Sequence, residues 1–270
     1  MFNQLNFKKT PLTLILLAVM VGMELANTLG DLSGSNRRNE IVRNIGISPY
    51  VWGYHDVVQS QNQENAVVYH VGQYWRPMMT CMIHGNLIHA FFNLYWFVIF
   101  GNMLERRYGP WRFLGLILFL AYFSIMLQFI VSNFNLFQYY KVPFLAFFER
   151  FFPHHQRYIP CVGFSGVIYG LFGFIWYARI KVYEFGWVCS KGTVQTFLIW
   201  FVVCLFLTRS GMMPIANTAH GAGLVLGYII ARSLYSPIRH ERWNWLLAMV
   251  FALLLTVTML AFTPPLLQLQ

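Results

Sequence analysis

The sequence has few charged residues, and this shortage is its most informative feature. Asp, Glu, Lys and Arg make up 10% of the 270 residues, whereas hydrophobic residues make up 57% and aromatic residues 19%. A soluble domain typically has about 25% charged residues. The chain therefore lacks the polar surface that a water-facing globule needs, and lipid is its natural solvent.

Acidic residues and cysteines are also scarce. The formal net charge is +10, but the cations lie between long apolar runs and not in one patch, as juxtamembrane charge does. We therefore expect no nucleic-acid partner. The four cysteines have no paired spacing, so we expect neither a disulfide framework nor a CxxC metal site.

Seven apolar windows approach or reach the length of about 20 residues that a membrane span needs. They are Leu12–Leu29, Asn86–Glu105, Phe113–Val131, Gly163–Arg179, Val194–Leu207, Pro214–Leu234 and Trp243–Phe262. The first window begins like a signal peptide, but no convincing cleavage site follows it, so we interpret it as a retained span. One compact helical domain accounts for this pattern.

The distribution of the cations orients these spans. With the N-terminus inside, more than half of the 19 Lys and Arg residues fall in short inner segments, and the rest are spread over much longer outer loops. A higher cation density in short inner loops is what the positive-inside rule describes. We therefore predict a cytoplasmic N-terminus.

Two predicted outer segments, Gly30–Gly85 and Phe134–Val162, are long and rich in Trp, Tyr and Phe. This composition favours segments that lie in the membrane interface, with a folded extracellular hairpin as the alternative.

Four polar residues lie inside three of the windows. His89 and Asn93 are near the start of the second window, Ser165 is at the start of the fourth, and His220 is in the first two turns of the sixth. At a rise of about 1.5 Å per residue, all four lie within roughly 10 Å of the outer boundary in the predicted orientation. Polar groups in spans are costly and usually face an interior site, so a shared depth indicates one site.

Glycines would bring two of these helices together. The fourth and sixth windows each carry a small-residue stripe, which lets helices approach closely; the glycines are Gly166, Gly170 and Gly173, and Gly223 and Gly227. Such contact would place Ser165 Oγ within reach of His220. A serine hydroxyl needs a neighbouring base before it becomes a nucleophile.

The second window supplies hydrogen-bond donors. His89 and Asn93 are four residues apart and share a helix face, so both can donate to one point, as an oxyanion hole requires. The helix N-terminus at Ser165 adds free backbone N–H groups. His84 is expected at the helix entrance, where it supports the preceding loop.

Each residue also has an ordinary interpretation. A lone Ser in a span is usually a packing residue, and a lone His could be a proton relay or a haem ligand. A proton-relay transporter would show matched broken helices in two halves, which are not visible. Zinc is disfavoured because no HExxH is present. We therefore expect no cofactor and no metal. The four residues together indicate a site, whereas none of them does so alone.

From about Leu12 to Leu234 the chain resembles the rhomboid intramembrane serine proteases. The matching segments occur in the family's order: Trp75-Arg76, His84-Gly-Asn-Leu-Ile-His89-Ala-Phe-Phe-Asn93, Glu105-Arg106-Arg107, Gly163-Phe164-Ser165-Gly166 and Ala219-His220-Gly-Ala-Gly223. The resemblance implies an all-α integral membrane fold, with a six-helix transmembrane bundle. In this chain a C-terminal seventh transmembrane helix would be added to that bundle. The first outer segment is longer than in compact members of the family, which implies an insertion somewhere in Ser48–His70.

The resemblance implies a role for each motif residue. Ser165 would be the nucleophile and His220 its general base, and His89, Asn93 and the Ser165 N–H would form the oxyanion hole. Tyr169 would pack on the His220 ring.

Two further features are implied by the resemblance. Gly163 would leave room for the substrate backbone, and the Thr208–Asn217 connection would form a flexible cap.

The implied activity is endopeptidase cleavage of transmembrane protein substrates in the lipid bilayer. The six-span core would comprise residues 12–234, and residues 235–270 would form a connector and the seventh span. The expected location is a bacterial inner membrane, as a multi-pass protein. The alternative is a catalytically inactive relative that binds membrane clients, although such relatives typically lose Ser or His.

Overall fold

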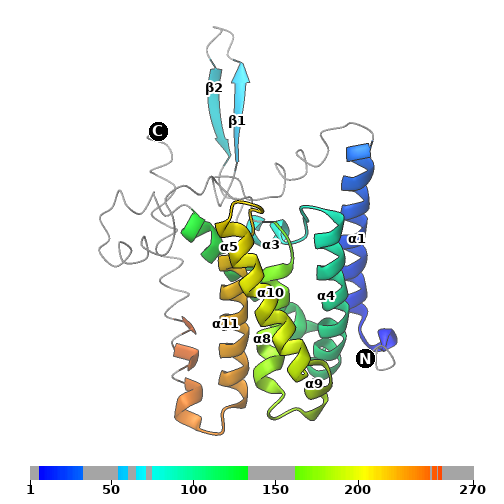
Figure 1. The fold of residues 1–270 in the computed structure, drawn as a ribbon, viewed down its shortest axis with the longest axis vertical. Helices are drawn as coiled ribbons and strands as arrows, with labels where there is room; N and C mark the ends of the chain where they lie inside the picture. The colour runs from blue at the N-terminus through cyan, green and yellow to red at the C-terminus, as the bar shows by residue number, and fades with distance from the viewer. Residues whose placement is uncertain are drawn as a thin grey trace, which may run out of the picture.

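The computed structural model describes residues 6–32, 54–59, 65–70, 75–132 and 162–250, apart from 244 and 248. Figure 1 shows the elements in chain order, which are η2 (Phe7–Lys9), α1 (Pro11–Leu32), β1 (Tyr54–Gln59), β2 (Asn65–His70), α3 (Arg76–Thr80), α4 (Leu87–Tyr108), α5 (Pro110–Ser132), α8 (Ser165–Ala178), α9 (Tyr183–Val188), α10 (Lys191–Arg209) and α11 (Asn217–Tyr235).

Each of the first six predicted windows overlaps one helix, namely α1, α4, α5, α8, α10 or α11. The all-helical membrane bundle predicted from the sequence is therefore confirmed. Helix α10 begins before the fifth window, at Lys191 rather than at Val194. It does not extend back to Trp187, which belongs to the separate short helix α9. The seventh window, Trp243–Phe262, and the outer segment Phe134–Val162 lie largely outside the described residues.

Within the described residues, four helical segments are long and apolar enough to cross a membrane: Pro11–Gly30, Leu87–Tyr108, Pro110–Gln128 and Lys191–Arg209. Helix α8 is apolar but has only 14 residues. At 1.5 Å per residue it is about 21 Å long, against roughly 30 Å for a hydrocarbon core. Because most of α8 is buried between α11 and α4 (Figure 1), it can begin below the membrane surface.

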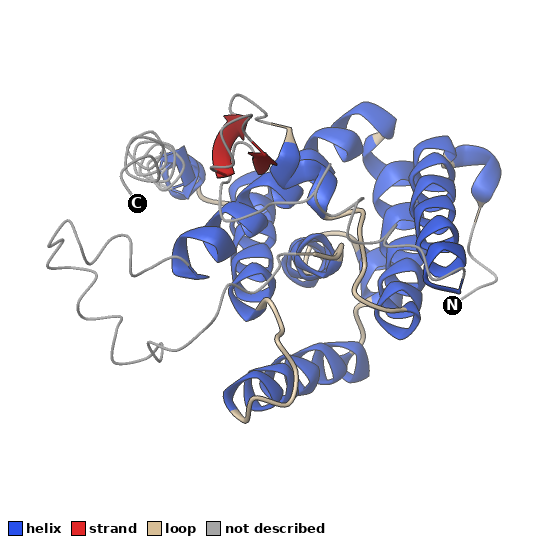
Figure 2. Cartoon of the chain, turned by 90° about the horizontal axis from the view of Figure 1, so that it is seen from above, coloured by secondary structure: helices blue, strands red, loops and turns tan. Residues whose placement is uncertain are grey.

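Helices α4, α8 and α11 run in one direction, and α1, α5 and α10 run in the other (Figure 1). We call the end at which α4, α8 and α11 begin the outer end, and the opposite end the inner end. Seen along the bundle in Figure 2, the helices surround one central helix. Helix α10 lies at the periphery, and most of its residues are at least partly exposed.

Strands β1 and β2 form an antiparallel hairpin that projects from the outer end (Figure 1). The register pairs Tyr54 with His70 and Gln59 with Asn65. The hairpin lies within the predicted insertion, so for this stretch the structure agrees with the folded hairpin rather than with an interfacial segment. It is an addition to the helical bundle and not part of it.

Helices α8 and α11 approach each other through backbone contacts. A Cβ atom on Gly223 would overlap the carbonyl oxygen of Gly166, and one on Gly227 would overlap that of Gly170. A Cβ atom on Gly173 would likewise overlap the carbonyl oxygen of Leu224. The predicted glycine interface is therefore confirmed, and only glycine permits this separation of the two helices.

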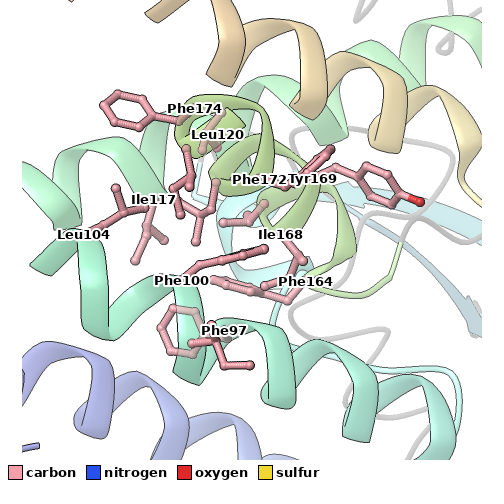
Figure 3. Packing of buried hydrophobic residues seen from close by; sticks show 14 of the residues in the cluster. Phe97, Phe100, Leu104, Ile117, Leu120, Phe164, Ile168, Tyr169, Phe172 and Phe174 are labelled. Carbon is pink, nitrogen blue, oxygen red and sulfur yellow. The ribbon is translucent and has the colours of Figure 1, made fainter. Parts of the chain in front are cut away.

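Aromatic and aliphatic side chains of α4, α5 and α8 fill the interior of the bundle (Figure 3). The Phe97 ring of α4 meets the Phe164 ring edge-on, with centroids 5.1 Å apart. On α8, Phe172 stacks on Phe197 of α10 at 4.2 Å. Lipid is as apolar as these side chains, so their contribution is close packing that holds the helices in register.

A buried carboxylate joins α1 to α4 at the inner end. The backbone N–H groups of Leu12 and Thr13 donate to the Glu105 carboxylate at 2.9 and 2.7 Å, and the Thr13 hydroxyl donates to it at 2.7 Å. The first N–H groups of a helix have no partner inside that helix, and a carboxylate at a helix N-terminus is favourable. Glu105 therefore caps α1 from a neighbouring helix.

We expect Gly223→Ala to lower the melting temperature in detergent, because the added methyl group would force α8 and α11 apart. Overpacking of this kind costs about 1–3 kcal/mol. Gly115→Ala is the matched control, because an added Cβ there meets nothing within 4 Å. The control should melt at or above the wild-type temperature, since Ala favours helix. Equal melting of Gly223→Ala and wild type would contradict the interface.

Candidate active site

Ser165 is the first residue of α8, and it is partly exposed. Its backbone N–H has no partner within the helix because it belongs to the first turn. Two residues earlier, Gly163 has a φ of 109°, a conformation that L side chains rarely adopt. The chain thus turns sharply into α8 and presents the Ser165 hydroxyl and N–H at the start of the helix.

The Ser165 hydroxyl contacts a histidine from α11. Ser165 Oγ lies 2.7 Å from His220 Nε2, a hydrogen-bond distance between residues 55 positions apart in the chain. Both side chains are at the outer ends of their helices, directly above the glycine interface. The close approach of α8 and α11 is therefore what brings the two side chains together.

The His220 ring is held by packing rather than by a carboxylate. Tyr169, one turn after Ser165, stacks on the ring with centroids 4.8 Å apart and planes 21° apart. The Tyr169 hydroxyl donates to the Phe197 carbonyl at 3.2 Å, which fixes the tyrosine ring. Among the described residues, His220 Nδ1 has no hydrogen-bond partner. A Ser-His-Asp triad fills that position with Asp, so this arrangement is a pair.

His89 lies beside the turn before Ser165. A Cβ atom on Gly163 would overlap the imidazole of His89, so the missing side chain of Gly163 is space that His89 occupies. The family resemblance implies that this space serves a substrate backbone. In the structure the His89 ring fills this space, which is one reason for a glycine at position 163. The positive φ of Gly163 is a second reason.

Asn93 lies one turn after His89 on α4 and is buried. Among the described residues, its Nδ2 has no hydrogen-bond partner. A buried amide donor without a partner is uncommon, because it costs about 1–3 kcal/mol. The predicted oxyanion donors His89 and Asn93 thus share a helix face, and Asn93 retains an unused donor.

His84 precedes α4, as expected for a residue at the helix entrance. Its ring meets the His89 ring edge-on, with centroids 5.3 Å apart, and it is buried. Burial, together with the neighbouring His89, lowers the pKa of His84 to about 3. His84 is therefore neutral and packs against the ring of a predicted oxyanion donor.

Sequence reasoning missed two polar residues of α5. The N–H of Ala219, next to His220, donates to Gln128 Oε1 at 3.1 Å. Ser124 is fully buried, and its side chain lies against Gly166. Gln128 thus satisfies an N–H in the first turn of the helix that carries His220. A Gln inside the apolar window Phe113–Val131 was the signal that could have identified it.

The connection between α10 and α11 has its two ends tied together. Asn217 Nδ2 donates to Thr208 Oγ1 at 2.8 Å, and the Ile215 N–H donates to the same oxygen at 3.3 Å. Between these ends, Met212 and Met213 are exposed. This is the Thr208–Asn217 connection that the family resemblance marks as a cap.

Within the part of the chain that the structure describes, no three His, Cys, Asp or Glu side chains are grouped so as to hold a metal ion. At the outer end, His89 lies against Gly163, and Asn93 lies one turn after His89 on α4. The neighbouring Ser165 hydroxyl is paired with the His220 imidazole, and a serine paired with a base can carry out covalent acyl transfer.

These observations define a helical membrane protein with a Ser–His pair near one end of its bundle. The Rhomboid domain family model matches residues 71–237, more than half of the chain. The chain therefore belongs to the rhomboid family and is an integral membrane protein.

Curated relatives agree with this assignment. Rhomboid protease GlpG of Serratia proteamaculans is 31% identical over 172 residues, which cover 64% of this chain and 51% of that protein. The proteins of the same name from Yersinia pseudotuberculosis and Yersinia pestis are 28% identical over 159 residues, covering 59% of this chain and 48% of theirs. The chain thus spans about half the length of these relatives.

We expect stability to fall on acidification because His84 is buried neutral. Its folded pKa of about 3 lies below the unfolded value of 6.5, so its contribution is present above pH 6.5 and is lost as the pH falls toward 3. The loss is at most about 1.4 kcal/mol per pH unit for one proton. Between about pH 7 and about pH 5 the melting temperature should therefore fall less steeply in His84→Gln than in wild type. The difference in slope should correspond to one proton per molecule.

The control is His240→Gln, which changes an exposed histidine at the inner end. This variant should keep the wild-type pH slope. If His84→Gln also keeps that slope, His84 is not the group that titrates.

Proposed function

We propose that this chain is an intramembrane serine endopeptidase that hydrolyses peptide bonds in or near the transmembrane segments of membrane proteins. The observation that carries the proposal is the 2.7 Å contact between Ser165 Oγ and His220 Nε2 at the outer end of a rhomboid-family bundle. The curated relatives described above are named rhomboid proteases, which supports the same reaction class.

In the proposed reaction, His220 Nε2 takes the proton of the Ser165 hydroxyl while Oγ attacks the scissile carbonyl carbon. The protonated imidazole then gives that proton to the leaving amine, which leaves an acyl group on Ser165. Water repeats the sequence with the same base and releases the new carboxyl group. His220 acts without a carboxylate partner, and the stacked Tyr169 ring keeps its Nε2 directed at Ser165.

The negative charge that forms on the carbonyl oxygen needs donors already in place. The Ser165 N–H, His89 and Asn93 would supply them, and the unpartnered Asn93 Nδ2 favours this role. Donors that are fixed before the reaction cost no reorganisation when the charge develops, so their effect on rate is large. His84 would position His89 through ring packing.

The substrates proposed are membrane proteins whose transmembrane segment unwinds near its outer end. A peptide bond within a helix is sterically shielded, so unwinding would have to precede attack by Ser165. The short helix α8 would place the site below the membrane surface.

The arrangement in the membrane is also part of the proposal. The N-terminus would be cytoplasmic and the Ser–His pair would face the outer leaflet of a bacterial inner membrane. Residues 12–234 would form the catalytic six-span core, and residues 235–270 a connector and a seventh span.

We expect Ser165→Ala and His220→Ala each to abolish cleavage of a single-span model substrate in proteoliposomes. Either change removes the nucleophile or its base, and for such units the loss in kcat is on the order of 10⁶-fold. Ser190→Ala and His240→Ala are the matched controls at the inner end and should cleave like wild type. Cleavage by Ser165→Ala at the wild-type rate would exclude the protease. Substrate binding without cleavage by wild type would favour the inactive relative.

Asn93→Ala should lower kcat by about 10²–10³-fold with little change in KM, because an oxyanion donor acts mainly in the transition state. Asn93→Asp keeps the size of the side chain but places a negative charge where the oxyanion forms, so it should be at least as slow. Melting temperatures would verify that both variants are folded. If folded Asn93→Asp retains wild-type kcat, Asn93 is not an oxyanion donor.

A further inference from the structure

Five exposed cations lie on three neighbouring elements at the inner end, away from the Ser–His pair. They are Lys8 and Lys9 of η2, Arg106 and Arg107 in the last turn of α4, and Arg112 in the first turn of α5. We call this set the basic cluster.

Two hydrogen bonds, one of them fully buried, hold η2 against α4. The Asn6 N–H donates to Asn102 Oδ1 at 3.2 Å, and Asn102 Nδ2 donates to Thr10 Oγ1 at 2.9 Å. Asn6 and Thr10 flank η2, so these bonds fix both ends of the segment that carries Lys8 and Lys9. The lysines are therefore placed by the fold beside the inner end of α4.

A one-residue turn places the third element. Gly109 alone separates α4 from α5, and its φ of 80° reverses the chain direction. The turn closes with the Gly109 N–H donating to the Glu105 carbonyl at 2.8 Å. Arg112 is thus held near Arg106 and Arg107 by the shortest possible connection.

The one carboxylate of these elements is engaged in capping a helix. Among the described residues of η2, α4 and α5, Glu105 is the one acidic residue, and it is buried while capping α1. Within η2 and the described residues of α4 and α5, the charged side chains that face solvent are therefore all cations. Cations concentrated in this way attract an anion, and their repulsion is relieved when one binds.

Apolar side chains beside the cations set their depth. Trp111 is 82% exposed between the two arginine-bearing turns, and Phe7 is 41% exposed next to Lys8. Trp at the end of a membrane helix lies at the level of the lipid headgroups. The cluster therefore faces headgroup phosphates and not bulk water.

We propose that the basic cluster binds the phosphate groups of anionic phospholipids, such as phosphatidylglycerol, in the leaflet at the inner end. Lys and Arg clusters directly beside a membrane span recognise anionic headgroups in this way. Lipid association at this surface is separate from peptide cleavage and holds whether or not the proposed protease activity does.

The test measures lipid binding without a substrate. Wild-type protein would be titrated in neutral detergent with phosphatidylglycerol and with phosphatidylcholine, and retained lipid measured by native mass spectrometry. We expect a clear preference for phosphatidylglycerol. The quadruple variant Lys8→Gln, Lys9→Gln, Arg106→Gln and Arg107→Gln should lose that preference at least about tenfold, as expected for the removal of several membrane-facing charges.

The matched control removes four other exposed cations from the same end, Lys181, Lys191, Arg239 and Arg242, by the same change to Gln. It should keep most of the preference, because the net charge changes equally while the cluster stays intact. An equal loss in both variants, or no preference in wild type, would overturn the site. Size-exclusion profiles and melting temperatures would verify that both variants are folded.

A final arm distinguishes a lipid from free phosphate. Inorganic phosphate in excess should raise the melting temperature less than phosphatidylglycerol does, since it brings no acyl chains to the exposed Trp111 and Phe7. An equal, cluster-dependent rise with inorganic phosphate would identify a phosphate site and overturn the lipid assignment.

Discussion

Backbone contact between α8 and α11 is the constraint on which the rest of the site depends. The two helices can approach this closely because Gly223 and Gly227 have no side chains to collide with the carbonyl groups of Gly166 and Gly170. Ser165 directly precedes Gly166, and His220 lies one turn before Gly223, so the geometry of this contact sets the separation of Ser165 Oγ from His220 Nε2. In lipid, packing of this kind takes the part that hydrophobic burial has in water.

Polar groups at the two ends of the bundle differ in their hydrogen bonding. At the inner end the Glu105 carboxylate accepts several hydrogen bonds and caps α1, as a membrane protein requires of its buried groups. Near the outer end Gln128 secures the first turn of α11. Asn93 Nδ2 and His220 Nδ1, in contrast, have no hydrogen-bond partner among the described residues. Glu105 and Gln128 thus use their hydrogen-bonding atoms to support helix ends, whereas Asn93 and His220 each keep one such atom without a partner in the described part of the chain.

Much of the fold was predictable because spans in lipid have a strong and simple signal. The windows around α1, α4, α5 and α10 could be identified from apolar length alone. Helix α8 could be identified from its glycines and its apolar run, but the sequence did not predict how short this helix is. The hairpin of β1 and β2 was left as an alternative, because isolated strands produce only a weak pattern. The short helix α9 was not predicted.

The sequence by itself determined the class of protein and the family, and it identified four polar residues predicted to lie at one membrane depth. It could do so because desolvation makes every polar residue within a span conspicuous. Only the tertiary structure decided the 2.7 Å contact of Ser165 with His220, the packing of His89 against Gly163, and the support of α11 by Gln128. These depend on which faces of different helices meet, and such contacts join residues far apart in the chain.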